Sequence, residues 1–245
     1  MNPPNTLRRL AASLFLLAGS VAAQERAPAP SYDPTPFREY GWVEFGYAHV
    51  PAFDATLSSV SSNGVVNQDL RMEMGPGFAV HGGLGESFSR WISAELLGGI
   101  YYHNVDEVSG ADGAGRGFDA SLLQVPIMVN LVVHVPLRSR LTPVLGGGAG
   151  AVISWLDVED QLPIGGGNVL QVNGSSTEVT FAYQAFAGLR YQYGDGAVVS
   201  LTYRLTGVGS PTWGLDDADT GDSVANLKAH DLLVHSLTLG FHISF

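Results

Sequence analysis

The sequence predicts an all-β fold in which eight antiparallel strands, each next to its neighbour along the chain, close into an up-and-down barrel. Three observations lead to this prediction. Eight segments alternate between apolar and small or polar residues with the period of two that a strand imposes. No helical period separates these segments. The connections between them alternate between long and short without exception.

The eight segments share a length of roughly 9 to 15 residues, which suits a tilted strand that crosses a bilayer. An even number of such strands is typical of a lipid-spanning barrel. The predicted strands cover residues 39–50, 77–85, 91–103, 121–135, 142–155, 178–193, 197–205 and 233–245.

The connections indicate a membrane and an orientation. A soluble eight-stranded meander has no reason to place every long loop at one end, whereas an outer-membrane barrel has short periplasmic turns and long outer loops. The sequence therefore predicts an outer-membrane location with both termini in the periplasm. The long connections are 51–75, 104–117, 156–177 and 207–229, and the short ones are 86–90, 136–140 and 194–196.

The two faces of the strands are then assigned by their aromatic and charged residues. Aromatic residues on the apolar face lie near the strand ends, as expected at two membrane interfaces: Tyr47, Tyr102, Trp155, Phe181, Tyr193 and Phe245. The opposite face carries four charges that would be costly in lipid and are expected to face the lumen: Glu44, Glu95, Arg190 and Arg204. A soluble lipocalin-like barrel would reverse this pattern and is the alternative.

The lumen charges have two interpretations. A barrel of eight strands is narrow enough for side chains to fill it, so the charges form a structural ion-pair network. Alternatively, they gate a small pore. Arg190 and Glu95 are expected to meet in the periplasmic half of the lumen. The hairpin around "YQYGDGAVV" is expected to have a three-residue loop that pairs Tyr193 with Ala197 and Leu189 with Leu201.

The first 23 residues are predicted to be a secretory signal peptide. Arg8 and Arg9 precede a short apolar stretch, and small residues up to Ala23 suit cleavage, although a short membrane anchor is the alternative. Removing this segment leaves 10 basic and 23 acidic side chains, hence a net charge of −13. A chain so acidic is a poor partner for nucleic acid. Residues 24–37 contain four prolines and are predicted to be a periplasmic linker, and residues 38–245 the barrel.

The segments "VPIMVNLVVHVPLRSRLTPVLGGGAGA", "AFAGLRYQYGDGAVVSLTYRL" and "HSLTLGFHISF" resemble the small eight-stranded outer-membrane barrels of the OmpA/OmpW-like kind. The resemblance covers about residues 38–245. It implies that the last strand carries a barrel-assembly signal made of Thr238, Gly240, Ile243 and Phe245. The implied partners are outer-membrane lipid, the barrel-assembly machinery and periplasmic chaperones. Longer relatives add a peptidoglycan-binding domain, and no such domain follows this barrel, so tethering to the cell wall is not expected.

The remaining segments give only weak indications of catalysis or of metal binding. His235 and Ser236 are adjacent on a strand and point to opposite faces, so a lipid-modifying hydrolase is disfavoured, although His242 and Ser244 share the lumen face. The acidic run 216–222 lacks calcium-loop spacing and is expected to be a solvated loop. The chain has no cysteine. We expect no enzyme activity, catalytic residue, cofactor or metal, and a structural or surface-exposed role, with a narrow solute channel as the alternative.

Overall fold

The computed structural model describes residues 39–245 except 62–63, 111–114, 138, 166–167, 194–195 and 217–222. The predicted signal peptide and linker lie outside these residues. Every regular element in this part of the chain is a strand. None of the described residues form a helix that is long and apolar enough to cross a membrane.

Eight strands form a closed antiparallel ring, which confirms the predicted barrel. Each pairs with the next ring strand along the chain, and β12 returns to pair with β1. The last closing contact is the bond that the Phe245 N–H donates to the Glu39 carbonyl at 3.2 Å. The ring strands are β1 (Glu39–His49), β4 (Gly77–Ser87), β5 (Ile92–Ser109), β6 (Gly115–His134), β7 (Leu141–Gly165), β8 (Asn168–Gln192), β9 (Ala197–Val208) and β12 (Leu232–Ser244).

The apolar faces of the ring strands point outward, as predicted for contact with lipid. Large apolar side chains on this face are about half exposed, including Leu131 at 53% and Phe181 at 65%. A soluble barrel would bury this face, so the lipocalin-like alternative does not fit the structure. Of the six aromatic residues expected at the interfaces, Tyr193 and Phe245 are the most exposed.

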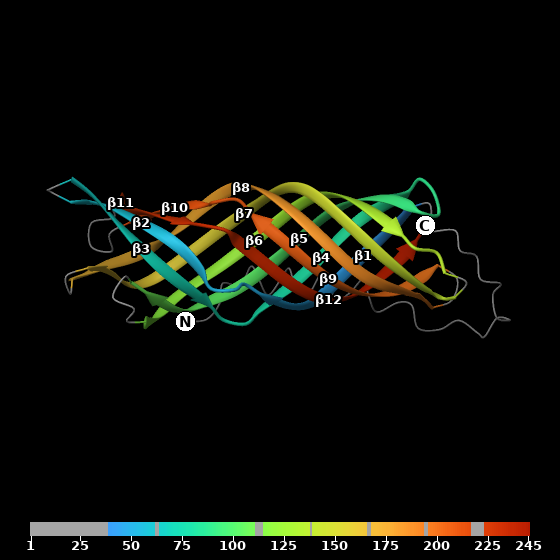
Figure 1. Ribbon diagram of the computed structural model, residues 1–245, viewed down its shortest axis with the longest axis horizontal. Coiled ribbons are helices and arrows are strands. Elements are labelled where there is room, and N and C mark those ends of the chain that lie inside the picture. Colours follow the sequence, from blue (N-terminus) through green and yellow to red (C-terminus); the bar gives the residue numbers. More distant parts are fainter. Residues whose placement is uncertain are drawn as a thin grey trace. The chain divides into compact units, whose positions relative to one another are not determined.

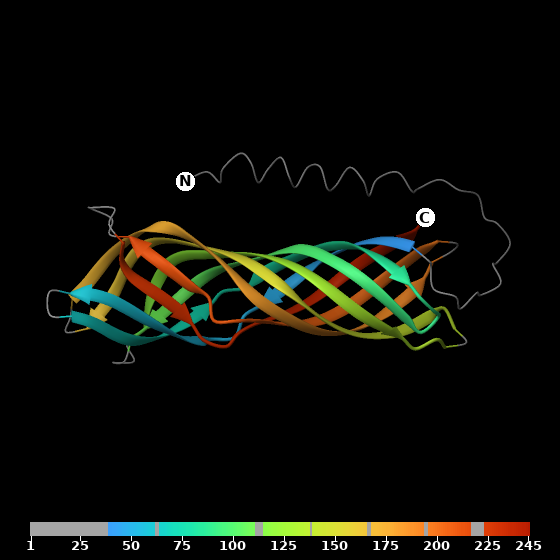
Figure 2. The same ribbon diagram turned by 90° about the horizontal axis from the view of Figure 1, so that it is seen from above.

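The prediction that the four long connections are loops was wrong. Two of them contain the hairpins β2–β3 and β10–β11, and the other two extend β5 to β8 beyond the ring. β11 pairs with β2, and β3 pairs with the end of β5, so these strands continue the sheet past β1, β4, β9 and β12. Figures 1 and 2 show them gathered at the end of the barrel opposite the C-terminus. Their bounds are β2 (Phe53–Ser61), β3 (Gly64–Met74), β10 (Thr212–Asp216) and β11 (Ser223–Ala229).

The two hairpins and the ends of β5 to β8 beyond the ring form an extension in which the polarity of the ring is reversed. Its apolar side chains point inward and form a buried core, while polar side chains such as Asp69 and Arg71 lie on the outside. This reversal explains the wrong prediction, because the polar residues that are typical of loops lie on the exposed face and the apolar residues between them face inward. The core includes Phe53, Leu57, Leu70, Met72, Val105, Val108, Phe118, Leu122, Leu156, Trp213, Leu215 and Leu227.

The register predicted for the β8–β9 hairpin is confirmed. Leu189 lies opposite Leu201, and the Tyr193 N–H donates to the Ala197 carbonyl at 2.9 Å. Gly196 has φ +86°, a conformation that a residue with a Cβ rarely adopts. The other two loop residues, 194 and 195, lie outside the described part of the chain.

Two glycines make a matched test of how closely the ring strands approach. A Cβ at Gly46 would overlap the carbonyl oxygen of Leu237, whereas a Cβ at the outward-facing Gly98 would meet nothing within 4 Å. Gly46→Ala is therefore expected to lower the free energy of unfolding by about 1–3 kcal/mol. Gly98→Ala should leave it almost unchanged. Reversible unfolding in detergent measures the free energy of unfolding of both variants. Equal losses would contradict the close approach of β1 and β12 at Gly46.

Candidate functional site

The polar lumen of the ring is the candidate site, because it gathers nearly all the buried polar side chains. Its residues come from every ring strand and share the face opposite the lipid-facing side chains. Those bonded to another lumen side chain include Tyr40, Glu44, Ser93, Glu95, Tyr101, Asn130, His134, Gln184, Arg190, Ser200, Thr202, Arg204, Thr206, Thr238 and His242.

The first cluster of the lumen surrounds Glu44 on β1. Arg204 on β9 donates through Nη2 to Glu44 Oε2 at 3.1 Å, and both side chains are almost fully buried. Thr202 Oγ1 donates to Oε1 at 2.9 Å, and Thr238 Oγ1 donates to Oε2 at 3.0 Å. Three donors therefore hold this carboxylate. The Arg204 guanidinium also lies 4.8 Å from the ring centroid of Phe186.

The second cluster lies nearer the C-terminal end of the barrel, around Glu95 on β5. Arg190 on β8 donates through Nη2 to Glu95 Oε1 at 2.7 Å, and the Tyr40 hydroxyl donates to the same oxygen at 2.6 Å. Ser93 Oγ is 3.1 Å from the Tyr40 hydroxyl and 2.8 Å from His134 Nε2. Arg190 is 13% exposed and Glu95 only 3%, so this cluster opens toward solvent on the arginine side.

Further hydrogen bonds cross the barrel. The Tyr101 hydroxyl on β5 is 3.0 Å from Thr206 Oγ1 on β9, a strand on the opposite side of the ring. Gln184 on β8 donates to Asn130 on β6, two strands away. Side chains from opposite walls therefore meet in the middle of the lumen.

Some buried polar atoms have no partner within the described structure. They include both ring nitrogens of His81, the amide of Gln124 and the hydroxyl of Ser154. All three side chains are at most 1% exposed. Gln124 and Ser154 lie directly opposite each other on β6 and β7. Buried polar groups usually have hydrogen-bond partners, so this part of the lumen has unused hydrogen-bonding capacity.

The structure brings the four predicted lumen charges together as two pairs, Glu44 with Arg204 and Glu95 with Arg190. Three neutral residues of these clusters, Tyr40, Thr202 and Ser93, are not among the predicted site residues. The signal that could have found them is parity, because each lies an even number of residues from a predicted lumen charge on the same strand. Which strands face each other across the lumen is not encoded in that signal.

Three residues of the predicted assembly signal lie on β12 and Phe245 directly follows it, and together they occupy both faces. Ile243 is 50% exposed and Phe245 80% exposed on the outward face. Thr238 binds Glu44 in the lumen, and Gly240 lies beside the same side chain, where a Cβ would come within 2.5 Å of Glu44 Cγ. The inward pair therefore has a structural role in the lumen, whatever its role in assembly.

The geometry gives little support to catalysis. His235 binds the Tyr203 hydroxyl on the outward face while Ser236 is buried in the lumen, as the alternation predicted. Two serine–histidine hydrogen bonds do exist, Ser93 with His134 and Ser200 with His242. Their serine side chains are 0% and 2% exposed, so a substrate cannot reach either hydroxyl.

No group of residues suited to a metal ion occurs in the part of the chain that the structure describes. Of the acidic run 216–222, Asp217, Asp219 and Asp222 lie outside it, and so does the side chain of Asp216. The expectation that this run is a solvated loop therefore stays a prediction.

The family model described as outer membrane protein beta-barrel domain matches residues 11–245. No curated protein shows significant similarity to the chain. Among solved structures, the outer membrane protein OprG from Pseudomonas aeruginosa has a TM-score of 0.57 at 12% identity, over 85% of this chain and 98% of that one. Neisserial surface protein A has a TM-score of 0.47 at 14% identity, over 84% and 97% of the two chains. At 12% identity the likeness to OprG concerns the fold alone.

Proposed function

Since the chain belongs to the outer membrane protein β-barrel domain family, and is thus an outer-membrane barrel, we propose that it is a structural protein with a sealed lumen. In this proposal the ring anchors the protein in lipid. The extension, which includes β2, β3, β10 and β11, presents a β-structured surface outside the cell, and both termini lie in the periplasm. The protein has no catalytic role.

The observation that carries the proposal is the hydrogen bond between Tyr101 and Thr206 on opposite sides of the ring. Tyr101 is 1% exposed, and the two ion pairs lie on the C-terminal side of it. A pore needs a water-filled path, and these contacts occupy the middle of the lumen. An eight-stranded barrel is also narrow enough for its interior side chains to fill it.

The extension supports the same proposal. Its inward face is apolar, and Trp213 and Leu215 of β10 and Leu227 of β11 are almost fully buried there. A hydrated ion would have to leave the polar lumen and cross this core to reach the other side. Burying a polar or charged group without partners is costly, so the core is a second barrier in series with the lumen contacts.

A narrow channel for small solutes is the second candidate function. It is favoured by the unpartnered buried atoms of His81, Gln124 and Ser154, which face the lumen. Such groups are usually satisfied by water, and a hydrated lumen is a precondition of conduction. A steady current across a planar bilayer would favour this candidate.

The proposed orientation can be tested by labelling, because the native chain has no cysteine. Asp69→Cys places a thiol on the exposed face of β3, and Arg140→Cys places one in the β6–β7 turn at the opposite end. A membrane-impermeant maleimide applied to whole cells should label the first variant and leave the second unlabelled. After osmotic shock, which admits the reagent to the periplasm, both should react. Labelling of Arg140→Cys alone in intact cells would reverse the orientation.

A further inference from the structure

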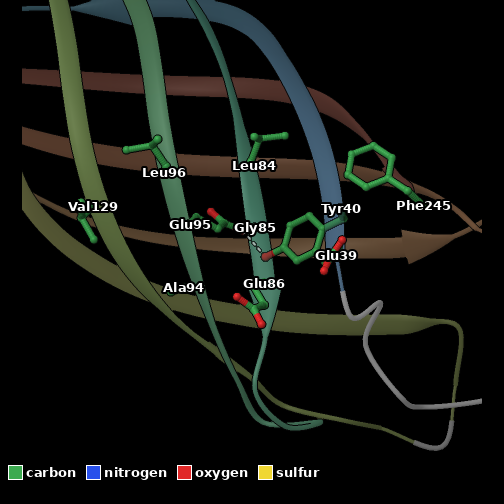
Figure 3. Close-up of a pocket in the computed structure, with 10 residues that line it drawn as sticks. All are labelled: Glu39, Tyr40, Leu84, Gly85, Glu86, Ala94, Glu95, Leu96, Val129 and Phe245. Carbon is green, nitrogen blue, oxygen red and sulfur yellow. Dashed lines mark hydrogen bonds between the residues drawn. The ribbon is translucent and has the colours of Figure 1, made fainter.

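A groove of about 390 Å³ lies on the outward face of the ring, near the end that carries the C-terminus (Figure 3). Its exposed lining combines an apolar side with two carboxylates. Figure 3 shows Glu39 and Glu86 toward the β4–β5 turn, and Leu84, Leu96 and Val129 farther from it. The lining also includes Ala94, Phe245 and the buried Tyr40, Gly85 and Glu95.

The register explains why the wall is hollowed here. One row of paired residues runs through Gly41, Leu84, Leu96 and Val129 on β1, β4, β5 and β6. The row below it runs through Glu39, Glu86 and Ala94. Gly41 and Ala94 are small, so the rows leave a depression between larger neighbours. The ring of Phe245 lies against Gly41 and closes one side.

The two carboxylates have an unusual arrangement. Glu39 and Glu86 lie directly opposite each other on paired strands, and both side chains are exposed on the outward face. Like charges in this position destabilise a sheet. Neither forms an ion pair with a cationic side chain in the described structure. A carboxylate on the lipid-facing surface also has a desolvation cost, which is smaller near the interface than at the midplane.

We propose that this groove binds a phospholipid whose head group carries a primary ammonium. The ammonium lies between Glu39 and Glu86, to which it donates hydrogen bonds, and an acyl chain follows Leu84, Leu96 and Val129. A cation between the carboxylates relieves their repulsion, and the adjoining apolar wall distinguishes a lipid from a free ion. The proposal rests on membrane insertion of the ring and is independent of whether the lumen conducts.

A second glutamate pair supplies a matched control. Glu73 and Glu107 also lie directly opposite each other, on β3 and β5, and both are exposed. They lie outside the groove and therefore lack its apolar wall. The variants Glu39→Gln/Glu86→Gln and Glu73→Gln/Glu107→Gln remove the same charge from the two places. Heat-induced unfolding in detergent verifies that both variants are folded.

Native mass spectrometry of the full-length protein with added lipid measures the binding. The probes are phosphatidylethanolamine, phosphatidylglycerol and phosphatidylcholine with identical acyl chains. The wild type is expected to retain the ethanolamine lipid about tenfold better than the other two, because only this head group has ammonium N–H donors. Glu39→Gln/Glu86→Gln should lose the preference, and Glu73→Gln/Glu107→Gln should keep it.

Three results would overturn the proposal. The wild type could retain all three lipids equally, or the control variant could lose the preference as the groove variant does. The preference could also disappear when EDTA removes divalent cations, which would mean that a metal ion bridges the carboxylates. A conducting lumen in a separate bilayer experiment would refute the sealed-barrel function and leave this binding result unaffected.

Discussion

Arg204→Ala is expected to lower the free energy of unfolding by about 3–5 kcal/mol, which is the usual loss when one member of a buried ion pair is removed. The substitution removes the cation from Glu44, which is 3% exposed in the native structure, and leaves two threonine hydroxyls as its remaining donors. It also removes the contact between the guanidinium and the Phe186 ring. Equilibrium unfolding in detergent with urea measures the loss.

Two further substitutions show whether the loss comes from an uncompensated charge. Arg204→Ala/Glu44→Ala should recover part of the stability, because it leaves no buried charge behind. Arg190→Ala should cost less than Arg204→Ala, since Arg190 is partly exposed and Glu95 keeps its bond from Tyr40. Adding Glu95→Ala should recover part of that loss too. Strictly additive losses in both double variants would count against the pairs.

Deleting Phe245 is expected to reduce sharply the amount of protein that reaches the outer membrane and to increase its degradation in the periplasm. The residue is 80% exposed on the outward face, and burying a phenylalanine contributes only about 1.5–3 kcal/mol. That is too little to decide the folding of the barrel. The proposed reason is instead that the assembly machinery recognises this end of β12.

Fractionation of cells and refolding into detergent separate the two explanations. Refolding of the deletion variant should remain largely intact, while its outer-membrane level falls. A charged tag appended after Phe245 should have the same effect in cells. Leu237→Ala removes a half-exposed apolar side chain elsewhere on the same strand face and is the matched control. Normal outer-membrane levels of the deletion variant would refute the assembly signal.

The ring was predictable because its strands obey a simple rule. Residues such as Val129 and Leu131 face lipid, while Asn130 between them faces the lumen, so the period of two and the polarity point to the same structure. The parity of outward residues also predicted the register of the β8–β9 hairpin. The predictions of the ring strands and of this register both depend only on residues that are close together in the sequence.

The extension was not predictable by the same rule, because its outward side chains are polar and its apolar ones face inward. β2 and β3 alternate like the ring strands, but Leu57 and Met72 are buried while the exposed partners are polar. Single apolar residues among Ser, Asp and Asn give these segments a composition that is typical of loops. The sheet forms there because β11 pairs with β2, a strand that lies far away in the sequence. A single sequence carries no direct signal of that pairing.

The lumen was predictable in part. Its four charges followed from the cost of placing them in lipid, but their neighbours in space depend on the stagger of the closed ring. Glu44 meets Arg204 two strands away, and Tyr101 meets Thr206 on the opposite wall. These contacts arise from barrel closure and not from strand periodicity, which is why the four charges could be predicted while the partners of Glu44 and Tyr101 could not.

Planar-bilayer recording tests the sealed lumen most directly. The refolded wild-type protein is inserted into the bilayer, and protease protection of the ring verifies insertion. The contacts of Tyr101, Glu44 and Arg204 and the apolar core predict no steady conductance at either polarity. A steady ohmic current that increases in unit steps with each inserted molecule would contradict the sealed lumen and establish the narrow channel in its place.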